Sequence, residues 1–171
     1  MNMNALEDML SLLQPDFNKL ASLQKEIREN LIQYADGKPL KGNELVGWLG
    51  EIYVKSLLDG KLVNDQNEHD VETNNQRISV KARKGNGSGW QQTSAIPKYE
   101  GEDCPTQLAF VHLLDDYSLD RIWLFDWQHL CQNNRFISHI VRGNHRSYIF
   151  KLNENRDREF IIYQRPHLRI S

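Results

Sequence analysis

A carboxylate, a hydroxyl and an amine lie within one polar stretch of this 171-residue chain. They belong to Asp70, Ser79 and Lys81, which fall in two segments of alternating polar and apolar residues on either side of Asn74-Asn75. Alternation with a period of two is typical of β-strands with one buried face. Since two asparagines favour a tight turn, we expect the segments to pair as an antiparallel hairpin.

The apolar residues determine the register of this hairpin. With Val71 opposite Ile78, the apolar side chains share one face, and a shift by one residue would separate them. Asp70 then lies opposite Ser79 on the polar face, which Lys81 shares. Directly opposed side chains are about 5 Å apart and diagonal ones about 7–8 Å apart. We therefore expect Asp70 and Lys81 to meet.

This polar patch has groups that can bind a metal ion and act on a phosphate. The carboxylate of Asp70 is a suitable ligand for a hard divalent cation. The ammonium group of Lys81 can steady an attacking water or a phosphate oxygen. The alternative is that Asp70 is a turn or strand-edge residue and Lys81 a solvated lysine.

The same stretch resembles the PD-(D/E)xK nuclease superfamily. Three features carry the resemblance, in this order along the chain: a helix containing Gly50-Glu51, the aspartate Asp70, and the strand Ile78–Arg83. A Gly-rich loop with Trp90 and two apolar strands follow, similar in order to restriction-endonuclease-like domains. The resemblance covers roughly residues 42–130.

The resemblance implies hydrolysis of DNA phosphodiester bonds with Mg²⁺, for which Mn²⁺ would substitute. Asp70 and Glu51 would bind the metal, and the backbone carbonyl of Val80 would supply another oxygen. Lys81 would orient or activate water. Ser79 stands where the family has an acid, so it would assist as a weak ligand or through a water.

One position departs from the family pattern, and another has a second interpretation. His69 replaces the proline that usually precedes the family's aspartate, which is a tolerated change. On a helical wheel Glu51 lies outside the apolar arc and near Lys55, so its alternative is a surface ion pair, with Glu44 as a substitute ligand. The apolar arc consists of Leu45, Val46, Leu49, Ile52, Tyr53 and Leu57.

The charge of the chain is uneven although its net charge is −2. Residues 1–74 carry 7 Lys/Arg and 13 Asp/Glu, whereas residues 135–171 carry 8 and 3. A basic C-terminal third suggests a polyanionic partner, here DNA. The expected backbone contacts are Arg83, Lys84 and the basic residues of the tail: Arg142, Arg146, Lys151, Arg156, Arg158, Arg165 and Arg169. The alternatives are an ion pair for Arg83 and Arg–Glu pairing along residues 154–159.

Helical periodicity dominates the first third of the chain. Steps of three and four residues between apolar positions predict helices over residues 6–13, 17–32 and about 42–58, separated by Pro15-Asp16 and by residues 36–39. The last helix should end near Asp59-Gly60. We interpret residues 1–40 as an N-terminal helical extension that packs as a helical hairpin. If the chain forms a homodimer, we expect these helices to mediate it.

Strand patterns follow. Beyond the hairpin, strands are expected at residues 107–113, 121–127, 147–152 and 160–164, with an acidic turn at 115–117. These elements predict an α+β fold with a mixed sheet of four or five strands and flanking helices. Residues 41–171 would form the restriction-endonuclease-like core of a single globular unit.

Composition narrows the class of protein. No apolar run approaches the ~18 residues of a membrane span, and no secretory signal opens the sequence. Cys104 and Cys131 lack the spacing of a disulfide framework or a zinc site. These observations favour a cytoplasmic protein without a membrane partner.

Two other functions remain open. Because Ser79 replaces an acid, the chain is alternatively an inactive nuclease-fold module that binds DNA or a protein partner. A third hypothesis is an interaction or immunity-type protein whose polar patch is only surface.

Overall fold

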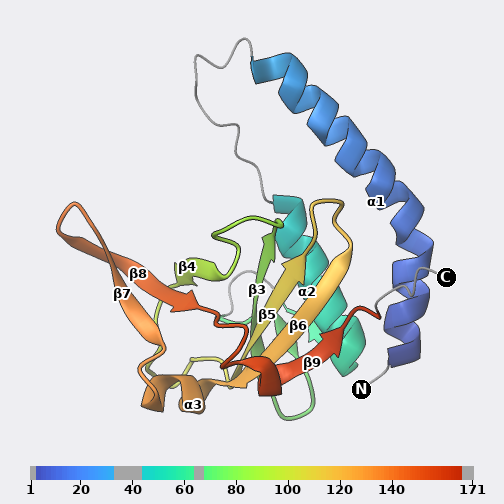
Figure 1. Ribbon diagram of the computed structural model, residues 1–171. Coiled ribbons are helices and arrows are strands. Elements are labelled where there is room, and N and C mark those ends of the chain that lie inside the picture. Colours follow the sequence, from blue (N-terminus) through green and yellow to red (C-terminus); the bar gives the residue numbers. More distant parts are fainter. Residues whose placement is uncertain (1–2, 33–43, 64–67, 167–171) are drawn as a thin grey trace.

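The structure, a computed structural model, describes residues 3–32, 44–63 and 68–166 (Figure 1). Its elements follow in this order: α1 (Met3–Ile32), α2 (Glu44–Leu58), β1 (Lys61–Leu62), β2 (Val71–Glu72), β3 (Arg77–Lys84), β4 (Gln92–Ile96), β5 (Gln107–Leu113), β6 (Leu119–Asp126), α3 (Trp127–Gln132), β7 (Phe136–Val141), β8 (Asn144–Lys151), the 3₁₀ turn η1 (Arg158–Phe160) and β9 (Ile161–Gln164). None of the described helices is long and apolar enough to cross a bilayer. Cys104 and Cys131 are free thiols.

The strands form two sheets. A mixed six-stranded sheet has the order β1-β2-β3-β5-β6-β9, and a second sheet has the order β4-β8-β7. Strands β3 and β5 run parallel, whereas all other neighbours are antiparallel. The α+β class with a mixed sheet is confirmed. The prediction of one sheet with four or five strands is wrong: the short strand β1 was not predicted, and the predicted strand at residues 147–152 belongs, as β8, to a second sheet.

The two faces of the six-stranded sheet are covered by different elements. Helix α2 covers one face, where Val54 and Leu57 share a hydrophobic cluster with Val80 of β3. The second sheet covers the other face through an aromatic cluster that includes Phe110 of β5 and Phe150 of β8. Since strand residues alternate between faces, Ser79 and Lys81 point toward the side of the second sheet.

The predicted register of the β2–β3 hairpin is confirmed. Val71 pairs with Ile78 and Glu72 with Arg77. The turn is closed by a hydrogen bond of 3.0 Å from the backbone N–H of Thr73 to the carbonyl of Gln76. Val71 and Ile78 are both fully buried, so the apolar face selects this register, as expected.

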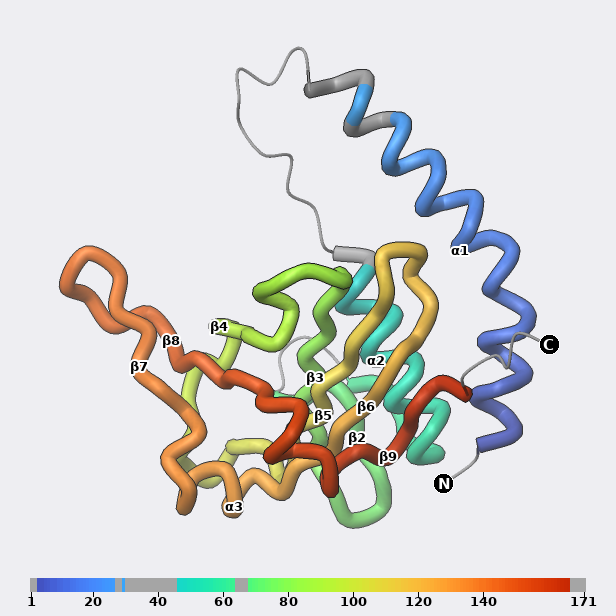
Figure 2. Tube along the Cα trace, in the orientation of Figure 1, coloured from blue at the N-terminus to red at the C-terminus, as the bar shows by residue number. Residues whose placement is uncertain are grey.

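The N-terminal helix differs from its prediction. Residues 3–32 form one continuous helix with Pro15 inside it, not two helices arranged as a hairpin (Figure 2). Proline removes a single backbone donor, and packing on both sides of it preserves the helix. Leu6 and Phe17 are buried in the same cluster as α2 and the sheet. Leu23, placed in the predicted apolar stripe, is 53% exposed.

The remaining elements agree only in part with the predicted helices and strands. Strand β5 has the bounds predicted for residues 107–113, and α2 ends at Leu58, where Asp59 adopts a φ of 52° and the N–H of Gly60 bonds to Lys55. Strands β1, β4 and β7 were not predicted. Trp127, expected in a strand, begins α3 because Asp126 accepts a hydrogen bond of 2.7 Å from the backbone N–H of His129 as its N-cap.

Candidate metal and phosphate site

Asp70 and Lys81 meet at the edge of the six-stranded sheet. The Nζ atom of Lys81 lies 3.8 Å from Oδ2 of Asp70. The hydroxyl of Ser79 donates to the same carboxylate oxygen at 3.4 Å. The three residue types predicted to share one patch are therefore brought together on one side of β3.

The carboxylate of Asp70 replaces part of the sheet ladder. The backbone N–H of Val80 donates to Oδ2 of Asp70 at 2.6 Å, at the place where β2 begins. The backbone of Asp70 is also fixed, because its N–H bonds to Ile78 and its carbonyl accepts from Val63. This arrangement holds the carboxylate in one position and also satisfies a backbone donor at a strand edge. It is compatible with both the metal-binding and the strand-edge interpretations of Asp70.

The carbonyl of Val80 faces the same edge. In a strand, the N–H and the C=O of one residue point toward the same neighbour. The N–H of Val80 points to Asp70, so its carbonyl is directed to the side where Asp70 lies. A carboxylate and a backbone carbonyl are hard oxygen donors of the kind that Mg²⁺ and Mn²⁺ accept. The donor types at this edge therefore fit such a cation.

The site is partly shielded from solvent. The side chain of Asp70 is 29% exposed and that of Lys81 is 18% exposed, whereas Ser79 is buried. Partial burial strengthens the attraction between the two charges and leaves part of the carboxylate exposed to solvent. A buried serine hydroxyl beside a carboxylate is at best a weak metal ligand, as the sequence indicates.

Glu51 lies closer to the sheet than the helical wheel predicts. The buried arc of α2 includes Val54, which is fully buried, while Ile52 is 37% exposed. Gly50 lies against β3, where an added Cβ would be 2.6 Å from the Cβ of Ala82. The arc is therefore turned toward Gly50 and Val54, and Glu51 is half-buried at its border.

The metal-ligand set predicted from the sequence contains two carboxylates, those of Asp70 and Glu51. Within residues 3–32, 44–63 and 68–166, no group of three or more His, Cys, Asp or Glu side chains is placed to hold a metal. A set made of Asp70, Glu51 and the Val80 carbonyl does not require one. The side chain of Glu44, the substitute candidate, lies outside the described residues.

Arg83 connects the two sheets. Its Nε donates to the carbonyl of Gln92 at 2.9 Å, and Nη2 donates to the hydroxyl of Thr93 at 2.8 Å. Nη1 donates to the carbonyl of Ala82, and burial lowers the pKa of the guanidinium. These bonds favour a structural role over a phosphate contact, and they attach β4 two residues beyond Lys81.

Lys84 is directed toward the turn between β5 and β6. Its Nζ donates to the carbonyl of Asp115 at 3.1 Å and lies 4.5 Å from the ring centre of Tyr117. Lys84 also lines a hollow of about 500 Å³ with residues of α1. Its charge is thus placed beside α1 and not beside Asp70.

Two histidines lie near these elements, and the anchoring role of one of them, His112, was not recognised from the sequence. His112 of β5 is buried, with Nδ1 2.8 Å from Asp120 and Nε2 2.7 Å from the carbonyl of Gly85. Its ring stacks on Trp90 at 3.7 Å and so fixes the Gly-rich loop. His69 precedes Asp70, and its buried Nε2 has no hydrogen-bond partner among the described residues. The signal for His112 was a histidine within an otherwise apolar strand.

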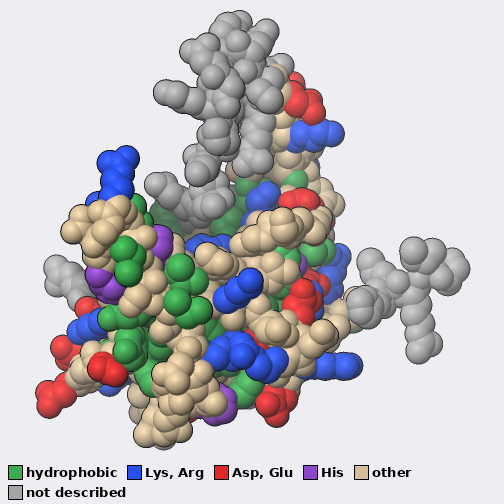
Figure 3. All heavy atoms as spheres, turned by 60° about the vertical axis from the view of Figure 1, so that its left-hand side comes forward, with side chains coloured by type: hydrophobic (Ala, Val, Ile, Leu, Met, Phe, Trp, Pro, Cys, Tyr) green, Lys and Arg blue, Asp and Glu red, His purple; other side chains and the backbone are tan. Residues whose placement is uncertain are grey.

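Some basic residues of the C-terminal third form ion pairs with acidic side chains, and others do not. Glu154 pairs with Arg121 at 2.7 Å, and Arg156 pairs with Asp157 at 3.3 Å, so the alternating Arg–Glu pairing does not describe this segment. Arg142 and Arg146 are exposed on the β7–β8 hairpin, and in the described part of the chain neither forms an ion pair. In Figure 3, which turns this hairpin forward, basic, histidine and hydrophobic side chains lie together on it. Arg169 lies outside the described residues.

A comparison with protein-family models finds no match for this chain, and a search of curated proteins finds none either.

Proposed function

We propose that this chain is a divalent-metal-dependent endonuclease that hydrolyses DNA phosphodiester bonds. The observation that carries the proposal is the contact of 3.8 Å between Lys81 and Asp70 at the edge of β2 and β3. The order of a Gly-Glu helix, an aspartate and a Val-Lys strand, which resembles the PD-(D/E)xK superfamily, supports the same assignment. A restriction-endonuclease-like core is part of this proposal.

Asp70 is the main ligand in this proposal. Its carboxylate and the carbonyl of Val80 face the same edge, and Glu51 on α2 would complete the set, with Ser79 contributing through a water. When bound, Mg²⁺ would lower the pKa of a water molecule and neutralise charge on the phosphate. Fixing Asp70 through the N–H of Val80 keeps its carboxylate oriented before the substrate arrives.

Lys81 acts on the substrate. Its ammonium group, held beside Asp70, would orient the attacking water and offset the negative charge that grows on the scissile phosphate. Because Lys81 is mostly buried, this charge is worth more in the site than it would be in bulk water. Asp70 in turn keeps the lysine side chain at the edge of the sheet.

Plasmid cleavage tests the proposal. Supercoiled DNA is incubated with wild-type protein, Lys81→Ala and the control Lys61→Ala, which removes an exposed lysine from β1. With Mg²⁺ or Mn²⁺, Lys81→Ala should cleave about 10²–10⁴-fold more slowly, while the control stays within about twofold of wild type. Undiminished cleavage by Lys81→Ala would refute the assignment.

A second candidate function is DNA binding without catalysis. It is favoured by Ser79, which is buried and carries a neutral hydroxyl where an acid would complete the metal site. Wild-type protein that binds DNA but does not cleave it with any of Mg²⁺, Mn²⁺ or Co²⁺ would support this candidate and exclude the nuclease.

A further inference from the structure

The β7–β8 hairpin extends away from the rest of the molecule. Figures 1 and 2, which share one orientation, show its outer half projecting away from the six-stranded sheet. Its base is in the core, where Phe150 is fully buried and Phe136 packs against it. Its outer half is exposed, and Ile140 near the tip is 62% exposed.

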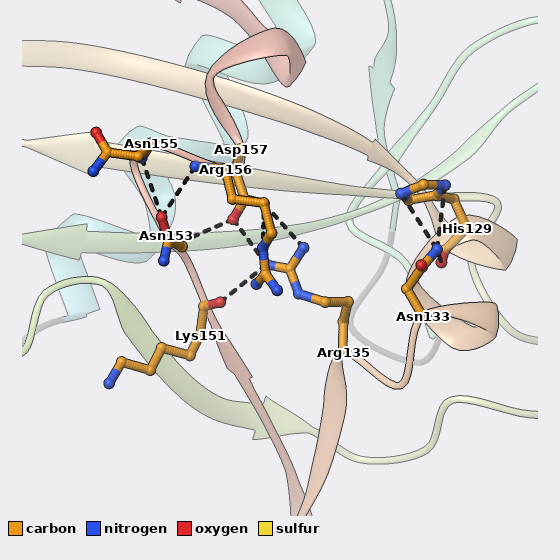
Figure 4. A network of polar contacts seen from close by, with 8 residues as sticks. All are labelled: His129, Asn133, Arg135, Lys151, Asn153, Asn155, Arg156 and Asp157. Atoms are coloured by element: carbon orange, nitrogen blue, oxygen red, sulfur yellow. Dashed lines mark hydrogen bonds and ion pairs between the residues drawn. The ribbon is translucent and has the colours of Figure 1, made fainter.

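The base of this arm is held firmly. Arg135, directly before β7, forms a two-point ion pair with Asp157 at 3.0 and 2.8 Å and also donates to the carbonyl of Lys151 at the end of β8 (Figure 4). The side chain of Asp157 is fully buried. Further out, the hydroxyl of Ser147 donates to the carbonyl of Ser94 at 2.6 Å. The arm is thus fixed to β4, which Arg83 connects to the strand of Lys81.

The arm carries positive charge without any negative charge. Residues 127–153 contain no Asp or Glu. Arg135 is neutralised by Asp157, but Arg142, Arg146 and Lys151 form no ion pair among the described residues. Such a distribution attracts a polyanion.

The tip of the hairpin has a backbone conformation that is unfavourable for an arginine. Arg142 and Gly143 form the two-residue turn, with φ of 52° and 78°. Tight hairpin turns of this kind need positive φ at both positions, for which Asn-Gly is preferred. An arginine there costs of order 1 kcal/mol, and such strain is typical of functional positions.

We infer that this arm is a β-ribbon that enters the major groove of duplex DNA. The inference rests on the proposed function and adds how the enzyme holds its substrate. The major groove is about 12 Å wide and admits a two-stranded ribbon. Arg142 and Arg146 contact phosphates at the rim. His145 and Ile140, paired across the strands, face the groove.

Charge distinguishes DNA from a second copy of the chain as the occupant. Strand β7 is an edge strand with Ile137 57% exposed, which by itself would suit pairing with another β7. Such pairing would bring together two arms that each carry the charges of Arg142 and Arg146, unpaired among the residues that the structure describes. Like charges disfavour that contact, whereas the phosphates of DNA neutralise it.

Binding measured without cleavage tests this inference. Fluorescence anisotropy of a 20-bp duplex in EDTA compares wild type, Arg142→Ala/Arg146→Ala and the charge-matched control Lys19→Ala/Lys25→Ala on α1. The control lysines are exposed and pair within their own helix. The arm variant should bind roughly tenfold or more weakly, and its slope of log K against log salt should fall by about 1.8, while the control matches wild type.

The inference is overturned by equal binding of the arm variant and wild type, by wild-type binding to single strands as tight as to the duplex, or by displacement from the duplex by netropsin, a minor-groove ligand. A salt-dependent dimer of the wild-type chain that the arm variant abolishes, without DNA binding, would also contradict it. EDTA prevents cleavage, so the binding assay reports only whether the β7–β8 arm holds DNA. Loss of catalysis is reported separately by the Lys81→Ala plasmid assay.

Discussion

The carboxylate of Asp70 accepts a hydrogen bond of 2.6 Å from the backbone N–H of Val80 in the adjacent strand. In a continuous ladder this donor would bond to a carbonyl of β2, but β2 extends only from Val71 to Glu72. A side chain therefore ends the pairing of the two strands. The same contact places an anionic group next to Lys81 at an accessible edge.

Asp70→Asn should separate the structural role of this residue from its chemical role. The amide oxygen can still accept from Val80, so we expect the free energy of unfolding to fall by only about 1–2 kcal/mol. Metal-dependent cleavage should fall by about 10² or more, because the anionic ligand is lost. Urea unfolding and plasmid cleavage measure the two effects. Cleavage by Asp70→Asn at the wild-type rate would contradict the site.

Ser79→Asp should make stability depend on metal. The hydroxyl of Ser79 lies 3.4 Å from the carboxylate of Asp70. A carboxylate at position 79 would therefore lie close to that of Asp70, and two close carboxylates repel each other. In EDTA we expect the protein to lose about 2 kcal/mol or more. A cation at 100 times its dissociation constant would restore about 2.7 kcal/mol.

Thermal unfolding with and without Mn²⁺ measures this effect. Ser138→Asp, an exposed position on β7, is the control and should show no dependence on Mn²⁺ beyond that of wild type. Equal responses of both variants to Mn²⁺ would argue against a cation at Asp70.

Gly50→Ala should push α2 away from β3. The added methyl would lie 2.6 Å from the Cβ of Ala82, so the helix must shift, at a cost of about 1–3 kcal/mol. Gly47→Ala meets nothing within 4 Å and should instead gain about 0.5–1 kcal/mol from helix propensity. Combining Gly50→Ala with Ala82→Gly should recover part of the loss in a double-mutant cycle. Purely additive effects would show that this close contact does not limit the packing.

The carboxylate of Asp120 should stabilise the fold only at a pH high enough to keep it ionised. Burial alone raises the pKa of its carboxyl, but hydrogen bonds from His112 and Arg121 outweigh this effect and hold the pKa below its ordinary value of 3.8. A depressed pKa stabilises the fold above the unfolded value, and the contribution is lost as pH falls through the folded pKa. We expect Asp120→Asn to cost about 2 kcal/mol near pH 6 and progressively less below about pH 4.

Denaturant unfolding as a function of pH checks this sign. The control Glu159→Gln removes an exposed carboxylate from η1 and should give a nearly constant difference from wild type. A cost for Asp120→Asn that grows on acidification would contradict the assigned direction.

The hairpin at the site was predictable because burial acts on it directly. Val71 and Ile78 must share the buried face, so one register is favoured and the positions of Asp70, Ser79 and Lys81 follow from it. The apolar run of β5 was equally informative, since both of its faces are covered. Strand β7 could not be recognised in the same way, because its outer half packs against neither core and its apolar residues occupy both faces.

The position of Glu51 shows a second limit. A helical wheel counts apolar side chains, and it gave weight to Ile52 while treating Gly50 as neutral. In the fold, the missing side chain of Gly50 allows the closest approach to the sheet, so the buried arc turns toward it. Likewise, the sequence pattern indicates a boundary at Pro15, although contacts of Leu6 and Phe17 with the core support a helix on both sides of it. Both errors arise from tertiary packing, which overrides local pattern.

The central claim, that Asp70 and the Val80 carbonyl hold a divalent cation beside Lys81, is tested most directly by a crystal soaked in Mn²⁺. Anomalous density should appear about 2–2.5 Å from an Asp70 carboxylate oxygen and from the Val80 carbonyl, and it should vanish in Asp70→Asn. Crystals at millimolar Mn²⁺ that show no peak at this edge, or one bound only elsewhere, would contradict the account.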